Sequence, residues 1–457
     1  MTELRRDPDE RKTERASDER QGPRVRAYRV EVTEGAAKGS KAVSRDGELS
    51  VGAAPGNDLV VEDARVSSHH LELEAFEGGV QLRDLGSTNG TDVDGYRTTG
   101  IVLRGQARIT IGNTQLWYTE EGQGPALPVS QHTSFGNAIG VSQAMRRIFS
   151  ILERIAPTEA TVLLEGESGT GKEVLARAIH ESSGRRTKPY VVMDCSATTA
   201  SLLESELFGH ARGAFTGAVK ERAGMAETAN GGTLFLDEIG EMPIDLQTRL
   251  LGLLERRTIR RVGASDERPV DIRVIAATNR DLRREVNEGH FRADLWHRLA
   301  VVRVNIPPLR QRPEDIVPIA RRIVADLQKR YKIPAGAAPI TDDLLLKLTR
   351  HRWSGNVREL RNHLERTIAM AASGGGDVDL GVEPDAAPSD HGSTDLTGAF
   401  KDAKLRHMSL FEKAYLGALL QRHKGNLSAA AREAGLSRLH LRMLARRYGI
   451  AAGSDKD

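Results

Sequence analysis

The sequence predicts a multidomain chain in which a β-sandwich precedes an α/β domain with a helical lid and a small all-α helix-turn-helix domain. The chain has 457 residues, more than one ordinary hydrophobic core accommodates. Apolar residues alternate with a period of two up to residue 120, whereas nearly continuous apolar runs alternate with helical patterns after residue 160. From about residue 404 only helical patterns remain.

The first part of the chain divides into a tail, a β domain and a linker. Residues 1–25 are mostly charged and contain no aromatic residue, which predicts a disordered tail. Residues 26–120 contain short alternating runs separated by Gly- and Asn-containing turns, a pattern typical of a β-sandwich with Leu71 and Ile109 on buried faces. The Gly, Pro and Ser content then predicts a linker over 121–135.

The central part has the pattern of a sheet covered by helices. Apolar runs between residues 161 and 306 predict parallel strands that are buried on both faces. We therefore expect an α/β domain over 136–308 and, from purely helical patterns, a lid over 309–373. The next segment, 374–403, is rich in acidic residues and predicts a flexible linker before the last domain, 404–450.

Cysteine content and charge limit the surroundings and partners of the chain. The single cysteine, Cys195, excludes an intrachain disulfide and fits a reducing cytosol. The charged N-terminus lacks a signal-peptide pattern, and no apolar run approaches the ~18 residues that span a bilayer, so we expect a cytoplasmic protein with no membrane partner. Residues 401–457 carry 12 Lys and Arg against 5 Asp and Glu, which indicates either a polyanion partner or a solvated helix face.

A glycine-rich stretch, GESGTGKE, follows the apolar run at 161–165 and precedes a helical segment. This G-x-x-x-x-G-K spacing between a strand and a helix predicts a phosphate-binding loop, because glycines let successive backbone N–H groups face phosphate oxygens. Glu173 stands where the general motif has a Ser or Thr for Mg²⁺, so we expect a carboxylate elsewhere to hold the metal. The predicted ATP-binding residues are Gly166, Glu167, Ser168, Gly169, Thr170, Gly171, Lys172, Glu173 and Asp237.

Polar residues at the ends of two later strands complete this site. Asp237 ends the run in GGTLFLDE and suits Mg²⁺ ligation, while the adjacent Glu238 suits polarising the attacking water. Asn279, after the next strand, is placed to orient that water. An acidic pair after a strand is often only a helix cap, so this prediction depends on the phosphate-binding loop.

Phosphoryl transfer also needs cations against the charge that develops on the γ-phosphate. Arg292 and Arg298 in FRADLWHRL and Arg358 in GNVREL are candidates. A helical arginine is usually only solvated, so spacing alone does not assign these three.

Residues 136–373 resemble the central AAA+ domain of bacterial sigma-54-dependent transcription activators, the NtrC-type enhancer-binding proteins. The motifs that carry the resemblance are GESGTGKE, ESELFGHARGAFTGA, GGTLFLDEIGEM, AATNRDL, FRADLWHRL and WSGNVREL. The resemblance implies an ATPase that forms a ring, usually a hexamer and at rest a dimer, and that remodels the closed complex of sigma-54 RNA polymerase holoenzyme with a promoter. Glu173 is the usual residue of this family.

The same resemblance assigns roles to residues that spacing alone leaves open. Arg292 and Arg298 would reach the γ-phosphate of a neighbouring subunit, and Arg358 would be the lid sensor. Asp194 stands where the family commonly has an Asn that contacts Glu238, which predicts altered coupling of hydrolysis to loop motion. A glycine-flanked loop with one exposed aromatic would contact sigma-54. Its residues are Gly213, Ala214, Phe215, Thr216, Gly217 and Ala218.

Near the C-terminus, residues 425–449 have the pattern of two helices joined by a turn at Gly435, and they resemble Fis-type helix-turn-helix domains. Domains of this type end many of these activators and bind enhancer double-stranded DNA as dimers. Residues at the start of the second helix would contact bases or phosphates. These are Ser437, Arg438, His440 and Arg442.

The N-terminal domain resembles forkhead-associated (FHA) domains through SVGAAPGNDLVVEDARVSSHH and LRDLGSTNGTDVDG. FHA domains bind phosphothreonine peptides, which implies a phosphothreonine protein or kinase as partner and Ser67, Thr88 and Asn89 as contacts. Ala53 and Ser68, however, stand where that family has arginines. A lost charge-assisted hydrogen bond costs roughly 1.5–3 kcal/mol, so a phosphothreonine ligand and a phosphate-independent contact surface both stay open.

Two other functions compete with the activator at this point. A general AAA+ remodeller of protein clients would share the ATPase motifs but would need neither GAFTGA nor a DNA-binding domain. A DNA-binding repressor with a vestigial ATPase is disfavoured by the complete set of Lys172, Asp237, Glu238 and the two arginines of FRADLWHRL.

Overall fold

The structure is a computed structural model, and its chain forms two compact units, Met1–Val382 and Glu383–Asp457. In the first unit it describes residues 24–44, 47–76, 78–126, 128–196, 199–215, 218, 220–332 and 342–372. In the second unit it describes residues 416, 419–420, 422–423, 427–433, 438 and 441–443. None of the helices in these ranges combines the length and the apolar composition of a bilayer-spanning segment.

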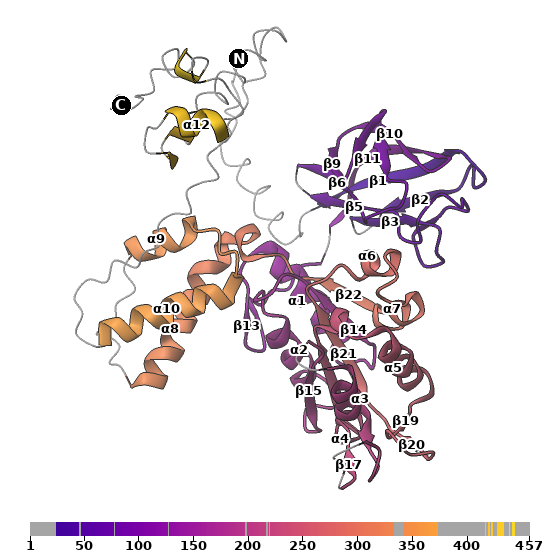
Figure 1. Ribbon diagram of the computed structural model, residues 1–457, viewed down its shortest axis with the longest axis vertical. Helices are drawn as coiled ribbons and strands as arrows, with labels where there is room; N and C mark the ends of the chain where they lie inside the picture. The colour runs from indigo at the N-terminus through magenta and orange to yellow at the C-terminus, as the bar shows by residue number, and fades with distance from the viewer. Residues whose placement is uncertain are drawn as a thin grey trace, which may run out of the picture. The chain divides into compact units, whose positions relative to one another are not determined.

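The N-terminal domain is a β-sandwich, as the alternating pattern predicts (Figure 1). One sheet has the strand order β2-β1-β11-β10-β7-β8 and the other β4-β3-β5-β6-β9. Leu71 and Ile109 are fully buried between the sheets. The strands are β1 (Arg24–Glu34), β2 (Lys41–Ser44), β3 (Glu48–Gly52), β4 (Leu59–Val60), β5 (Leu71–Phe76), β6 (Gly79–Asp84), β7 (Thr91–Val93), β8 (Tyr96–Thr98), β9 (Gly100–Leu103), β10 (Gln106–Ile111) and β11 (Thr114–Ala126).

Strand β11 extends past the domain end that the sequence pattern suggests. It pairs with β1 from Gln115 as far as Ala126, whereas we expected the domain to end at residue 120. The Gly and Pro content that predicted a linker from residue 121 therefore lies partly inside a paired strand. Backbone pairing with β1 supplies hydrogen bonds that local composition does not reveal.

The α/β domain contains a parallel sheet with the order β15-β18-β21-β14-β22. Helices cover both faces: α1 and α2 pack on one, and α3, α4, α5 and α7 on the other (Figure 1). The sheet strands are β14 (Val162–Glu165), β15 (Tyr190–Asp194), β18 (Thr233–Asp237), β21 (Arg273–Thr278) and β22 (Val302–Asn305). The helices are α1 (Gln143–Ile155), α2 (Lys172–Glu181), α3 (Ala200–Phe208), α4 (Met225–Thr228), α5 (Ile244–Arg256), α6 (Leu282–Asn287) and α7 (Ala293–Leu299), with a 3-10 turn at Ile239–Glu241.

Three short two-stranded ribbons accompany the main sheet. They are β12 (Ser134–Phe135) with β13 (Ala138–Ile139), β16 (Gly209–His210) with β17 (Arg222–Ala223), and β19 (Thr258–Arg260) with β20 (Glu267–Pro269). GAFTGA lies between the two strands of the β16–β17 ribbon.

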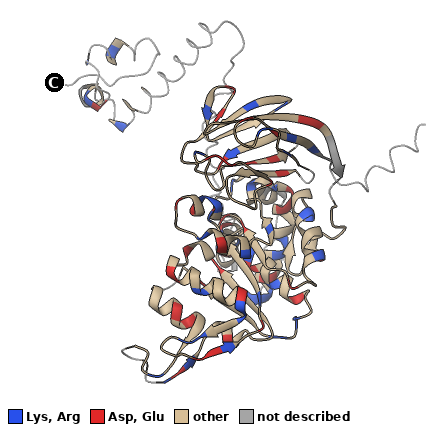
Figure 2. Ribbon diagram, turned by 90° about the vertical axis from the view of Figure 1, so that its right-hand side faces the viewer, with Lys and Arg blue, Asp and Glu red and all other residues tan. Residues whose placement is uncertain are grey.

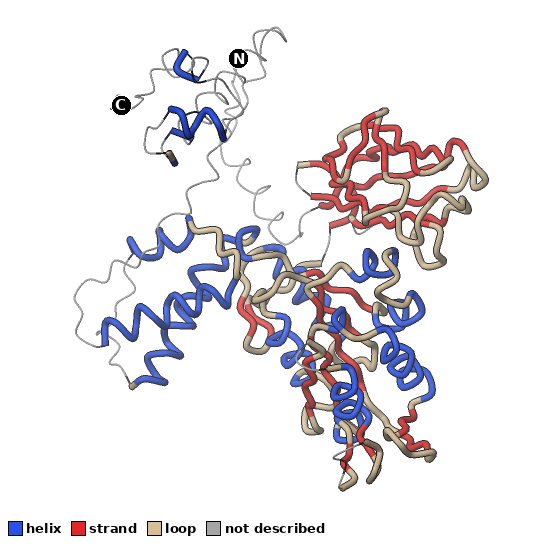
Figure 3. Tube along the Cα trace, in the orientation of Figure 1, coloured by secondary structure: helices blue, strands red, loops and turns tan. Residues whose placement is uncertain are grey.

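The lid is helical, as predicted, and packs around its own apolar core (Figure 3). Its elements are 3-10 turns at Leu309–Gln311 and Pro313–Asp315, α8 (Ile316–Tyr331), α9 (Asp342–Arg350) and α10 (Asn356–Ala372). Trp353 is buried in that core, and its indole N–H donates to the Leu348 carbonyl at 2.8 Å. In the view of Figure 2, basic and acidic residues are interspersed along the helices and loops of the ATPase fold.

In the second unit, α12 (Leu427–Glu433) is the helix that the GNLSAAARE sequence predicts. Leu427, Ala430, Ala431 and Leu441 are buried together. Gly435, the predicted turn residue, lies outside the described residues.

Candidate nucleotide-binding site

The loop from Gly166 to Gly171 joins β14 to α2 and contains three glycines with positive φ, 153° at Gly166, 78° at Gly169 and 106° at Gly171. L-residues with side chains rarely adopt such angles, so these positions require glycine. A Cβ at Gly169 would also lie 2.5 Å from the Gly355 carbonyl of the lid. The absence of a side chain there lets the lid approach the loop.

Lys172, the first residue of α2, folds back over this loop. Its Nζ donates to the carbonyls of Gly166 at 2.8 Å and Glu167 at 3.2 Å, and lies 3.7 Å from Glu238. Burial lowers the pKa of Lys172, although Glu238 and Asp237 partly oppose this effect. The ammonium group is thus held at the loop, where it can reach a bound phosphate.

Asp237 and Glu238 lie beside this lysine because only one strand, β21, separates β18 from β14 in the sheet. Burial, and then the charge of Glu238, raise the pKa of Asp237. A bound divalent cation would remove this cost by neutralising the carboxylate pair. Glu238 has a left-handed backbone with φ of 49°, and its carboxylate accepts the backbone N–H of Asn279 at 3.0 Å.

The lid contributes two side chains that bind Glu167 of the loop. Arg310 donates to the Glu167 carboxylate at 2.6 and 2.8 Å, and Asn356 donates to it at 3.1 Å. Arg310, followed by Asn356, lowers the pKa of Glu167. The amino-acid sequence does not reveal either partner, because neither residue lies near the loop along the chain. The WSGN sequence was the available signal for Asn356.

Arg358, the predicted lid sensor, contacts the phosphate-binding loop. Its guanidinium donates to the Ser168 hydroxyl at 2.6 Å. A pocket of about 670 Å³ opens between loop and lid. Its lining residues are Glu167, Ser168, Asn279, His351, Trp353, Ser354, Gly355, Arg358, Glu359, Asn362, His363 and Arg366.

Arg292 and Arg298 do not line this pocket. Arg292 precedes α7 and binds Asp294 at 2.7 Å, whereas Arg298 donates to the Leu254 carbonyl at 3.3 Å. Lys172, Asp237 and Glu238 do not line the pocket either, but Lys172 lies 3.7 Å from Glu238, which in turn binds the Asn279 N–H. Among the described residues, neither arginine forms a hydrogen bond or ion pair with this group.

The residues present fit ATP and Mg²⁺. The loop offers backbone N–H groups at the N-terminus of α2, where negative phosphate is favoured. Asp237 supplies a hard oxygen ligand of the type that Mg²⁺ prefers, and a bound cation would favour its charged form, which burial and the charge of Glu238 disfavour. Glu173, in the first turn of α2, has no hydroxyl to add to this ligand set.

The GAFTGA segment forms a turn beyond the ribbon of β16 and β17. Gly213 donates its N–H to the Ala218 carbonyl at 2.8 Å, and Ala218 donates to the Phe215 carbonyl at 3.0 Å. The Phe215 side chain is 47% exposed, with its ring edge-on to His210 at 5.0 Å. Thr216 and Gly217 lie outside the described residues.

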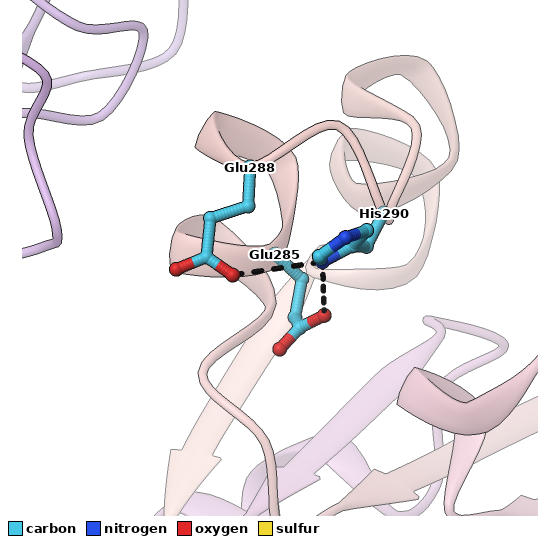
Figure 4. A group of neighbouring side chains, drawn as sticks. All are labelled: Glu285, Glu288 and His290. Carbon is cyan, nitrogen blue, oxygen red and sulfur yellow. Dashed lines mark ion pairs between the residues drawn. The ribbon is translucent and has the colours of Figure 1, made fainter.

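One cluster in the ATPase domain has the composition of a metal site. Glu285 of α6, Glu288 at its C-cap and His290 just beyond it approach one another, and the imidazole Nδ1 lies 3.4 and 3.5 Å from the two carboxylates (Figure 4). Glu285 also pairs with Arg280, and Glu288 with Arg284. These ion pairs account for the cluster without a metal.

Ser67, Thr88 and Asn89 of the FHA-like domain lie together, as the resemblance implies. The Ser67 hydroxyl accepts the Thr88 N–H at 3.0 Å, and the Asn89 amide donates to the Arg65 carbonyl at 2.8 Å. The guanidinium of Arg97, from β8, packs closely against Gly90, beside these residues. A Cβ on Gly90 would lie only 1.9 Å from it.

The predicted DNA contacts are only partly described. Arg438 and Arg442 are exposed, as a nucleic-acid contact requires, whereas Ser437 and His440 lie outside the described residues. Two of the four predicted DNA contacts thus lie among the described residues of this unit.

Comparison with known proteins identifies the family. Residues 138–305 match the sigma-54 interaction domain, 310–381 an AAA+ ATPase lid domain, and 408–443 the Fis family of bacterial regulatory proteins. The transcriptional regulatory protein ZraR of Escherichia coli K12 is 44% identical over 316 residues, which cover 69% of this chain and 68% of ZraR. The chain belongs to the family of sigma-54-dependent transcriptional activators.

Other members and solved structures agree with this membership. The DNA-binding transcriptional activator HyfR of Escherichia coli K12 is 44% identical over 283 residues, 60% of this chain and 42% of HyfR. A crystal structure of NtrX from Brucella abortus in complex with ATP is 34% identical, with a TM-score of 0.50 and coverage of 70% of both chains. The activator spans about two thirds of the length of the ZraR proteins that it matches.

The N-terminal domain of this activator matches a different family. Residues 31–122 match the cytoplasmic domain of an inner membrane component of the type III secretion system. This match and the two-sheet sandwich support the FHA-like fold, and they name no ligand for it.

Proposed function

We propose that this activator hydrolyses ATP to remodel a closed complex of sigma-54 RNA polymerase with a promoter into an open one. The observation that carries the proposal is Phe215, which is 47% exposed at a turn of the same domain that holds the nucleotide site. An exposed aromatic side chain is an apolar anchor for a protein partner. Membership of the family supplies sigma-54 as that partner.

Each residue of the nucleotide site has a distinct role in hydrolysis. Lys172 binds the β and γ phosphates, and Asp237 holds Mg²⁺, which neutralises phosphate charge when bound. Glu238 orients and polarises the attacking water, and its position is fixed by the Asn279 N–H at 3.0 Å. Arg358 reports the state of the nucleotide to the lid through its contact with Ser168.

The two α7 arginines act on a neighbouring subunit in this proposal. Arg292 and Arg298 bind groups of their own domain and do not line its own pocket. Each arginine would add positive charge beside the γ-phosphate that is bound by an adjacent subunit. ATP hydrolysis would therefore require a ring of subunits, which is a hexamer in the active form. The C-terminal helices would tether this ring to enhancer DNA through Arg438 and Arg442, and the FHA-like domain would provide regulatory input.

Substitution of Phe215 tests the proposal. Phe215→Ala should abolish open-complex formation on a sigma-54 promoter, measured by transcription with purified polymerase, while ATP turnover stays within about twofold of wild type. Phe76→Ala is the matched control, because Phe76 is also 47% exposed but lies on the FHA-like domain. Wild-type transcription by Phe215→Ala would refute the role of the loop.

A further inference from the structure

The FHA-like domain contacts the ATPase domain through one end of its sandwich. This FHA loop end consists of the β3–β4 loop (53–58), the β4–β5 loop (61–70) and the β6–β7 loop (85–90). The same three loops carry the positions that bind phosphopeptide in the family that the domain resembles. Their partner in this chain is the segment of α6 and α7.

Asn287, at the end of α6, joins two of these loops. Its amide nitrogen donates to the carbonyls of His69 at 2.6 Å and Leu85 at 3.1 Å. Its amide oxygen accepts the backbone N–H of His69 at 3.2 Å. One side chain thus uses both its donor and its acceptor on the FHA loop end, as a specific contact requires.

Ion pairs extend the contact toward the nucleotide site. Glu72 of β5 binds Arg283 of α6, and it lies 3.9 Å from Arg303 of β22. Arg303 in turn binds Glu165 at 2.9 Å, the residue directly before the phosphate-binding loop. Although burial raises the pKa of Glu72, the guanidinium groups of Arg283 and Arg303 outweigh it and hold that pKa at about 2.

Close packing accompanies these polar contacts. The His69 ring is 1% exposed and lies 4.6 Å from the Trp296 ring of α7. A Cβ on Gly56 would lie 2.6 Å from the His297 ring, so a side chain there would displace that ring. Glycine at 56 therefore permits the approach of the two domains.

The same contact leaves buried polar atoms unsatisfied. Within the described residues, the Nε and Nη1 of Arg283, the Nε1 of Trp296 and the Nε2 of His69 have no hydrogen-bond partner. Each buried polar group without a partner costs about 1–3 kcal/mol. An interface with such costs opens more easily than a domain core, which suits a contact that is made and released.

The contact also involves a segment with predicted functional residues at both ends. Asn279 lies just before the Asp281 cap of α6, and Arg292 caps α7. Arg298 lies in α7 next to His297, which packs against Gly56. Fixing α6 and α7 against the FHA loop end therefore restrains the arginines that would have to reach another subunit.

We propose that the ligand of the FHA loop end is the α6–α7 segment of the same chain, and that this contact restrains Arg292 and Arg298. Ala53 and Ser68, in place of the arginines of phosphothreonine-binding relatives, fit a protein ligand without phosphate. The expected effect of this restraint on ATP turnover rests on the proposed function, whereas the contact between the FHA loop end and α6–α7 does not.

Asn287→Asp in the full-length protein tests the contact. The aspartate keeps the acceptor for the His69 N–H but replaces the donor to the carbonyls of His69 and Leu85 by a charged oxygen. Hydrogen exchange, without nucleotide, DNA or polymerase, should be about thirtyfold faster for amides of residues 66–72 and 282–299, since two hydrogen bonds of about 1 kcal/mol each are lost and about 1.4 kcal/mol corresponds to a factor of ten. Asn230→Asp is the control, because the Asn230 side-chain oxygen accepts the Asp271 N–H at 2.7 Å and an aspartate keeps that acceptor.

ATP turnover measured on the same proteins tests the restraint. Asn287→Asp should raise turnover at least threefold, and Asn230→Asp should leave it unchanged. Unchanged hydrogen exchange in Asn287→Asp would overturn the contact, and faster exchange with unchanged turnover would overturn the restraint. Because exchange is measured without polymerase, failure of the contact is distinguishable from failure of the Phe215 loop in transcription.

A phosphothreonine peptide library and its unphosphorylated counterpart, titrated against the full-length protein, test the choice of ligand. We expect no phosphate-dependent binding to wild type or to Asn287→Asp. Phospho-dependent binding to wild type that leaves exchange of residues 282–299 unchanged would overturn the assignment of α6–α7 as the ligand.

Discussion

Acid should weaken the contact between the FHA-like and ATPase domains through a single histidine. Burial, together with Arg283 and His297 nearby, lowers the pKa of His69 to about 4. The geometry explains this: the His69 Nδ1 lies 3.1 Å from the Asn57 amide oxygen, while Nε2 is buried with no hydrogen-bond partner among the described residues. A proton on Nε2 would place a charge in contact with Trp296 and near a guanidinium.

The sign and size of the effect follow from the two pKa values. When His69 becomes solvated its pKa returns toward 6.5, so the opened protein takes up a proton that the closed protein does not. Above pH 6.5 the lowered pKa of His69 does not change the free energy of opening the contact. This free energy decreases as the pH falls from 6.5 toward 4. At 1.36 kcal/mol per pH unit, the contact should lose about 2 kcal/mol between pH 7 and pH 5. Glu72, with a pKa of about 2, adds nothing in this window.

Native-state hydrogen exchange measures this free energy of opening directly. Amides of residues 66–71 are followed from pH 7 to pH 5 after correction for intrinsic exchange rates. His69→Asn serves as the comparison, because its amide can still bond to Asn57 but does not titrate. We expect the wild-type free energy of opening to fall with acid about 2 kcal/mol more than that of the variant. Parallel profiles for the two proteins would refute the assignment to His69.

Substitutions at three further positions test the nucleotide site. Lys172→Ala should abolish ATP turnover in a phosphate-release assay, with the fold retained by circular dichroism, because the loop loses its only ammonium. Asn356→Gly and Asn356→Ala should both weaken ATP binding in a titration, since each loses the bonds to Glu167 and Ser168. Asn356 has φ of 55°, so the alanine variant should also be about 1 kcal/mol less stable than the glycine variant in urea denaturation. Asp194→Asn should change the ATPase response to added sigma-54, and an identical titration curve would count against a switch role. In the structure its carboxylate accepts from the N–H and hydroxyl of Ser196.

The fold class and the family were predictable because their signals are local. The sandwich and the parallel sheet follow from apolar periods of two and from continuous apolar runs, and both are confirmed. The strand end at Ala126 was not predictable, since it depends on pairing with β1, which lies about ninety residues earlier. The roles of individual site residues stay predictions, and GAFTGA is described only in part.

The sequence by itself determined the order of the domains, the phosphate-binding loop and the GAFTGA segment, because each depends on residues that are contiguous in the chain. Only the tertiary structure decided which distant residues support them. Arg310 binds Glu167 across 143 positions, and Arg283 binds Glu72 across 211 positions. Charged residues are common on any surface, so their local pattern does not indicate a partner. The fold selects the pairs by burying them together, where the electrostatic interaction is strong and an unpaired charge is costly.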